Sequence, residues 1–220
     1  MSMLQLRAAD GHTLDAWLVR PEGTPRGAIV VVQEIFGVNS NIRRIVEVCA
    51  SQGYLAIAPS MFDRQKRGLD LPYTAEGVQQ GIACMNATTP VQALDDMRAA
   101  VDAVAHAGRI GVVGYCWGGY VAALKACRGN VAAAVAYYGG GLPRLLSQRP
   151  ACPLLLHFGE QDSHIPLSDV DQVRKAWPEA IVHLYPAGHG FACPDRADFE
   201  PASARLAGER SLEFFRKHVG

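Results

Sequence analysis

The sequence lacks an excess of charge of one sign, a long apolar run and closely spaced cysteines. Its 220 residues include 21 basic and 21 acidic side chains, so the formal net charge is zero. Without a basic stripe, nucleic acid is not an expected partner. No apolar run approaches the roughly 20 residues that cross a bilayer, so a membrane is not expected either. Because no basic segment followed by an apolar one opens the chain, we predict no signal peptide and a cytoplasmic protein.

The cysteines form no Cys-x-x-Cys pair, and no histidines lie near them at zinc spacing. We therefore expect no metal site and reduced thiols, most of which pack as small apolar side chains. Two of the six have chemically interesting neighbours, Cys116 in a glycine-rich turn and Cys193 just after His189. The six are Cys49, Cys84, Cys116, Cys127, Cys152 and Cys193.

The composition is that of an ordinary globular protein, with 49% hydrophobic and 19% charged residues. With no repeat or linker, residues 1–220 are predicted to form a single domain, which we expect to be a monomer or a weak homo-oligomer. An antiparallel hairpin is predicted over residues 4–7 and 13–19. After it, buried strands alternate with amphipathic helices, which predicts an α/β fold whose central sheet is mostly parallel and covered by helices on both faces. Residues 61–89 are less regular and are predicted to contain a short helix, as a candidate lid or as a plain solvated loop.

The stretch 109–119 reads Arg-Ile-Gly-Val-Val-Gly-Tyr-Cys-Trp-Gly-Gly. An apolar run ends in a tight turn in which Gly114 and Gly118 flank Cys116, and a helix of small residues follows. This is the form of a nucleophile elbow, a strained strand-to-helix turn, with cysteine in place of serine. At a helix N-terminus, backbone N–H groups and the helix dipole favour a thiolate. The alternative is a buried, unreactive cysteine at an ordinary turn.

A cysteine nucleophile needs a base, and the base needs an acid to orient it. His189 lies in a glycine-flanked loop after the last predicted strand, whereas His157 lies inside an apolar strand and is predicted to be a core residue. Asp162 follows the preceding strand, which gives the chain order nucleophile, acid, histidine. Sites in such sheets lie outside the carboxyl ends of the strands, where all three are expected. Three other acids compete for the role: Glu160, Asp169 and Asp171.

Five motifs, in order along nearly the whole chain, resemble those of the dienelactone hydrolases. They are QEIFGVN at 33–39, GYCWGG at 114–119, YYG at 137–139, HFGEQD at 157–162 and GHGF at 188–191. The resemblance implies an α/β-hydrolase fold, a Cys-His-Asp triad and no cofactor. It also implies that the small-molecule substrate is an enol-lactone or a similar activated ester from the breakdown of aromatic compounds.

The resemblance further implies a role for each matching residue. Cys116 would attack the carbonyl and become an acyl thioester, and His189 would hold the thiol proton and later activate water. Asp162 would fix the tautomer of the imidazole and stabilise its cationic form. The backbone N–H groups of Ile35 and Trp117 would form the oxyanion hole.

Glu34 matches the family's carboxylate that contacts the resting thiol. In that role it would keep Cys116 neutral until substrate arrives and so limit oxidation. The alternative is a carboxylate held in a salt bridge at a loop.

The chain departs from the best-known members of the family around its histidine. Those members carry a serine directly after the histidine and an arginine four residues beyond it, where this chain has Gly190 and Cys193. Their second substrate-binding arginine has no clear match in the middle segment. Since arginine is the natural partner of a carboxylate, the losses predict a different or broader substrate. Candidate replacements in the substrate pocket are Arg64, Arg67 and Arg196, and Tyr138 and Trp117 are candidate pocket walls or packing residues.

Three functions therefore remain open from the sequence. The first is hydrolysis of an enol-lactone or small activated carboxylic ester, and the second is a carboxylesterase of broader, neutral-ester specificity. The third is a catalytically silent scaffold that binds a ligand or senses oxidation through Cys116.

Overall fold

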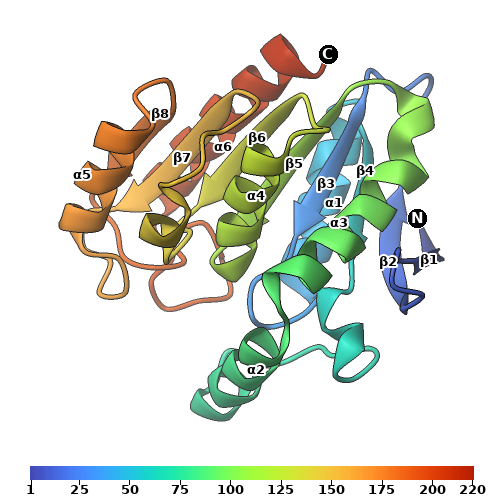
Figure 1. Cartoon of the computed structure of the whole chain (residues 1–220), viewed down its shortest axis with the longest axis horizontal. Helices are drawn as coiled ribbons and strands as arrows, with labels where there is room; N and C mark the ends of the chain where they lie inside the picture. Colours follow the sequence, from blue (N-terminus) through green and yellow to red (C-terminus); the bar gives the residue numbers. More distant parts are fainter.

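The computed structural model describes all residues, Met1–Gly220, and centres on one eight-stranded sheet between layers of helices (Figure 1). The strands are β1 (Ser2–Arg7), β2 (Thr13–Val19), β3 (Ala28–Val32), β4 (Leu55–Pro59), β5 (Ile110–Tyr115), β6 (Ala133–Tyr137), β7 (Leu154–Gly159) and β8 (Ile181–Tyr185). Their order across the sheet is β1-β2-β4-β3-β5-β6-β7-β8. The pairs β1–β2 and β2–β4 are antiparallel and the other five are parallel. The predicted mostly parallel sheet with an N-terminal antiparallel hairpin is confirmed.

The helices lie on both faces of the sheet, α3 and α4 in front of it and α1 and α6 behind it in the view of Figure 1. They are α1 (Ser40–Ser51), α2 (Ala75–Ala87), α3 (Pro90–Val104), α4 (Trp117–Arg128), α5 (Leu167–Ala176) and α6 (Pro201–His218), with short 3₁₀ turns η1 (Met61–Arg64), η2 (Ala105–Ala107) and η3 (Leu142–Leu145). None of these helices is both long enough and apolar enough to span a membrane.

The central strands are apolar at every position because both of their faces are covered. In β3, Ile29 and Val31 pack in one apolar cluster with Ile42 of α1, while Val30 packs in the other with Met97 of α3. Successive side chains of a strand point to opposite faces, so β3 contributes side chains to both apolar clusters. This packing fixes the sheet and holds the carboxyl ends of β3, β5, β6 and β7 at one edge.

The irregular segment 61–89 contains a longer helix than the sequence predicts. Thr74 caps α2 by accepting a hydrogen bond from the N–H of Gly77 at 3.2 Å. The helix projects from the body of the molecule below α3 in Figure 1, and only two of its residues are buried. A helix with so little buried surface shows a weak apolar stripe, which is why the sequence pattern indicated only a short one.

Candidate active site

A strained turn places Cys116 between β5 and α4. Its φ of 53° and ψ of −119° lie outside the regions that side chains favour, which costs on the order of 1–3 kcal/mol. A Cβ atom on Gly114 would collide with the carbonyl oxygen of Gly118, and one on Gly118 would collide with the backbone of Val32 and Gln33. The two glycines therefore let three backbone segments approach closely, and the predicted elbow geometry is present.

Three side chains that are distant in the sequence meet at this turn. The Nε2 atom of His189 lies 3.2 Å from the Sγ atom of Cys116. The Nδ1 atom of the same ring lies 2.8 Å from Oδ2 of Asp162, to which it donates. The other oxygen of Asp162 accepts hydrogen bonds from the backbone N–H groups of His164 (2.8 Å) and Ile165 (3.2 Å). The carboxylate is thus fixed by its own loop and presents one oxygen to the imidazole.

The electrostatics of the three groups favour a charged imidazole. Burial by itself disfavours the cation of His189, but the hydrogen bonds to Asp162 and Cys116 outweigh it and raise the pKa of His189 to about 10. Burial by itself raises the pKa of Asp162. The hydrogen bond from His189 and the positive charge of that ring outweigh burial and lower the pKa of the carboxyl. An imidazolium between a carboxylate and a sulfur is therefore the stable arrangement near neutral pH.

The competing acids do not reach the imidazole. Glu160 and Asp171 are exposed, and Asp169 is half-buried in the first turn of α5. Asp162 is buried and in direct contact with His189.

Two backbone donors of residues that line the cavity with Cys116 have no protein acceptor. Ile35 follows β3 and Trp117 opens α4, and both line the same cavity as Cys116. Neither N–H donates to a backbone carbonyl, since Trp117 lies in the first turn of its helix and Ile35 lies outside the sheet ladder. The pair has the composition of the oxyanion hole predicted from the sequence.

Glu34 is fully buried below the site, and its partners differ from those expected. Its Oε2 atom accepts a hydrogen bond from the hydroxyl of Tyr73 at 3.3 Å, and its Oε1 atom lies 3.6 Å from the guanidinium of Arg196. The hydrogen-bond partner of the Cys116 sulfur is His189 instead. Burial raises the pKa of Glu34, against the charges of Arg196 and His189 and the hydrogen bond from Tyr73. In this conformation Glu34 has the salt-bridged arrangement of the alternative interpretation.

Tyr73 connects this buried carboxylate to the chain that leads into α2. Its hydroxyl also accepts hydrogen bonds from the side chain of Asn39 (2.9 Å) and from the thiol of Cys193 (3.2 Å), and its ring packs 4.5 Å from that of Phe36. The segment before α2 is therefore anchored on the loop that follows β3.

Of the three arginines proposed for the pocket, Arg196 lines the cavity and the other two do not. Arg64 forms a bidentate ion pair with the fully buried Asp96 and a second ion pair with Asp10. Arg67 binds Asp15 and Thr13 on the N-terminal hairpin. Neither Arg64 nor Arg67 lines this cavity, because both guanidinium groups are held by partners outside it.

Tyr138 is also not a pocket wall. Its side chain is fully buried, and its ring lies 5.2 Å from the ring of His189 and 5.4 Å from that of Phe191. It packs behind the imidazole, whereas Trp117 does border the cavity.

The cavity above Cys116 has a volume of about 520 Å³. The segment 61–89 contributes to its wall through α2, as expected for a substrate-facing excursion. Two other residues of the wall, Arg144 and His164, were not among the residues predicted for the pocket. Only their positions in the sequence could have indicated a place in the wall. Arg144 comes shortly after the three glycines that follow β6, and His164 comes two residues after Asp162.

The whole chain is similar to known proteins. The model of the "Dienelactone hydrolase family" matches residues 14–219. A carboxymethylenebutenolidase of Pseudomonas putida is 36% identical, over 96% of this chain and 94% of its own. A putative carboxymethylenebutenolidase of Azospirillum brasilense is 34% identical over the full length of both chains. The crystal structure of a putative dienelactone hydrolase from Klebsiella pneumoniae superposes with a TM-score of 0.85 at 27% identity, over 99% of this chain and 100% of that one.

These similarities cover the elbow, the histidine loop and the strands that carry them. Taken with the sheet order, they mean that the chain belongs to the dienelactone hydrolase family and is a hydrolase with the α/β-hydrolase fold.

Proposed function

We propose that this hydrolase cleaves an enol-lactone or a small activated carboxylic ester through Cys116, His189 and Asp162, by way of an acyl thioester. The observation that carries the proposal is the unbroken sulfur–imidazole–carboxylate chain, with contacts of 3.2 and 2.8 Å. The relatives named carboxymethylenebutenolidase support the same class of substrate.

In the first half-reaction, the Cys116 thiolate attacks the carbonyl carbon, and the carbonyl π electrons move onto oxygen. The resulting oxyanion accepts hydrogen bonds from the N–H groups of Ile35 and Trp117, which have no acceptor within the protein. Collapse of the tetrahedral intermediate breaks the ester C–O bond. The imidazolium of His189 gives its proton to the departing oxygen, which leaves an acyl thioester and a neutral imidazole.

In the second half-reaction, the neutral His189 takes a proton from water as the water oxygen attacks the thioester carbonyl. The C–S bond then breaks, the carboxylic acid product leaves, and the thiolate–imidazolium pair is restored. Asp162 holds Nδ1 throughout, so that Nε2 faces the sulfur and the water in turn. Esters and lactones suit this site better than amides, because an amide nitrogen must be well protonated before it leaves.

The test is turnover of a dienelactone and of a small aryl ester by wild type, Cys116→Ala and the matched variant Cys127→Ala. Cys127 is half-buried at the end of α4, away from the cavity. We expect Cys116→Ala to lose at least about a thousandfold in kcat/KM with an unchanged circular dichroism spectrum, while Cys127→Ala keeps the wild-type rate. Retained activity in Cys116→Ala would remove the thiol from the mechanism. Rapid oxidation of Cys116 with no hydrolysis of any ester would favour the silent scaffold instead.

A further inference from the structure

The cavity above Cys116 has two chemically different ends. Its 17 lining residues include two arginines and two histidines but no aspartate or glutamate. Two buried carboxylates contact lining residues, and both are already paired, Glu34 with Arg196 and Asp162 with His189. The remaining arginine, Arg144, is exposed and takes part in no ion pair. The cavity therefore holds an uncompensated positive charge in a protein whose net charge is zero.

The end of the cavity on the β3 side is mostly apolar. Val78, Ile82 and Met85 of α2 line it together with Phe36 from the loop after β3. Arg196 also reaches this end, 5.9 Å from the Phe36 ring, but its charge is paired with Glu34. Val78 and Ile82 are 36% and 40% exposed, so an apolar group placed against them would remove their side chains from water. This end suits an aromatic ring or an alkyl chain.

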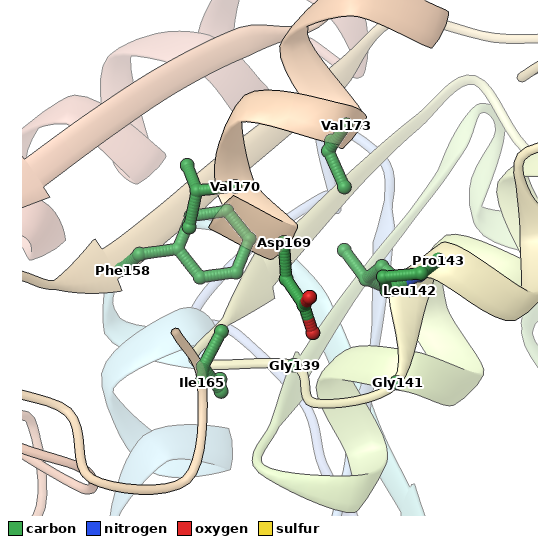
Figure 2. A pocket seen from close by; sticks show the side chains of 9 residues that line it. All are labelled: Gly139, Gly141, Leu142, Pro143, Phe158, Ile165, Asp169, Val170 and Val173. Atoms are coloured by element: carbon green, nitrogen blue, oxygen red, sulfur yellow. The ribbon is translucent and has the colours of Figure 1, made fainter. Parts of the chain in front are cut away.

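The opposite end lies over β6 and β7 and carries Arg144 and His164. Arg144 belongs to η3, which follows β6, and His164 belongs to the loop that follows β7. Figure 2 shows the turn from Gly139 to Pro143 facing Ile165, the neighbour of His164, so the two loops lie side by side. The guanidinium bends back over its own turn, since a Cβ atom on Gly141 would lie 3.9 Å from Nε of Arg144.

Cys116 lies between the two ends because β5 lies between β3 and β6 in the sheet. A substrate whose carbonyl reaches the sulfur must therefore extend toward α2 on one side and toward Arg144 on the other. The two ends select opposite properties in the two parts of that molecule.

We propose that Arg144 is a specificity-determining residue, which binds a carboxylate on an amphiphilic ester whose apolar part lies against α2. The proposal rests on the ester hydrolysis proposed above and names the class of ester. A free guanidinium in a cavity without acids gains a charge-assisted hydrogen bond to a carboxylate at little cost. Neither Gly190 nor Cys193 supplies such a group, and Arg196 must give up Glu34 to do so.

The experiment compares three phenyl esters: neutral phenyl acetate, 4-acetoxybenzoate with the carboxylate on the leaving group, and monophenyl succinate with the carboxylate on the acyl group. The readout is the ratio of kcat/KM for the better carboxylated ester to that for phenyl acetate. It is measured for wild type, Arg144→Gln, Arg144→Glu and Arg149→Gln. Arg149 is a matched control, because it is 77% exposed, lies five residues away outside this cavity and carries the same charge.

We expect the ratio to fall about tenfold in Arg144→Gln, as for loss of one hydrogen bond to a charged group, and further in Arg144→Glu. Arg149→Gln should keep the wild-type ratio. An unchanged ratio in Arg144→Gln, or an equal fall in Arg149→Gln, would overturn the proposal while leaving the hydrolase function intact. Failure of the wild type to hydrolyse any of the three esters would count against the proposed function itself.

Discussion

The guanidinium of Arg196 lies against the backbone of Gly190, where a Cβ atom would come within 2.7 Å of its Nε and Cζ atoms. This contact links two departures from the best-known family members. They are the glycine directly after the histidine and the absence of an arginine four residues beyond it. The space that a serine side chain would fill is occupied by a guanidinium that enters from position 196. It stacks 5.9 Å from the ring of Phe36 and pairs with Glu34.

Gly190→Ala should therefore destabilise the protein and displace Arg196. Gly190 has a φ of 80°, so a side chain there adds backbone strain to the collision, and we expect a loss of about 1–3 kcal/mol in the free energy of unfolding. Urea denaturation measures it. Gly208→Ala in α6 is the control, because nothing lies within 4 Å of its added Cβ atom, and it should gain up to about 1 kcal/mol. If Arg196 causes the collision, Gly190→Ala should cost less in an Arg196→Ala background; equal costs in both backgrounds would refute this contact.

The pKa of His189 should fall when the sulfur is removed. In the wild type it is about 10, and the hydrogen bond and charge of Cys116 contribute to the increase, as does Asp162. We expect the pKa to decrease in the order wild type, Cys116→Ala, Cys116→Ala/Asp162→Asn. Titration of the ¹⁵N-labelled imidazole by NMR measures each value. An unchanged pKa in Cys116→Ala would mean that the sulfur and imidazole do not interact in solution.

The Arg64→Ala substitution should lower the free energy of unfolding far more than Arg67→Ala does. The Arg64 side chain is 7% exposed and that of Asp96 is 0% exposed, so removal of the guanidinium leaves a buried carboxylate unpaired, at a cost of about 3–5 kcal/mol. Arg67 is 46% exposed, and its loss should cost less than about 1 kcal/mol. Burial already raises the pKa of Asp96, so the penalty in Arg64→Ala should shrink as the pH falls and protonation relieves the buried charge. Denaturation at pH 8 and pH 5 checks both statements; equal costs for the two arginines would contradict the assigned roles.

His157 should make the protein less stable in acid. Its ring bonds Tyr185 at 2.8 Å and Ser211 at 3.0 Å, and burial together with the charges of His183 and Arg210 puts its pKa well below 6.5. The unfolded chain takes up this proton near pH 6.5 and the folded one only at lower pH. The stabilisation is therefore complete above pH 6.5 and is lost as the pH falls toward the folded pKa, by up to about 1.4 kcal/mol per unit. His157→Gln should flatten the decline of unfolding free energy between pH 7 and pH 5, and exposed His106→Gln should not. A decline as steep in His157→Gln as in wild type would assign the acid sensitivity to other groups.

The parts of the site that local sequence signals specify were predictable. Cys116 follows β5 in a glycine-framed turn, and Asp162 and His189 follow β7 and β8 of the same parallel sheet. The carboxyl ends of parallel strands share one edge, so three strand ends sufficed to predict that the side chains meet. The fold followed from the same alternation of strands and helices.

The parts that depend on long-range pairing were not predictable. Nothing in the sequence distinguishes Arg64 from an arginine at the surface. Its partner, Asp96, lies 32 residues away in the chain. The partners of Glu34 come from positions 73 and 196, and Arg144 reaches the cavity only because η3 packs against the loop after β7. The contacts that a side chain makes depend on the tertiary structure. Whether a residue lies at the end of a strand can be predicted from the neighbouring sequence.

The elbow keeps its shape through backbone contacts of Gly114 and Gly118, none of which involves the side chain at position 116. A serine placed there inherits the same unfavourable dihedral angles and the same direction of its Cα–Cβ bond. The choice of attacking element is thus independent of the scaffold, and a single-nucleotide exchange from a cysteine to a serine codon separates thiol from alkoxide chemistry. For protein engineering, position 116 therefore allows cysteine, serine and selenocysteine to be compared as nucleophiles on the same backbone.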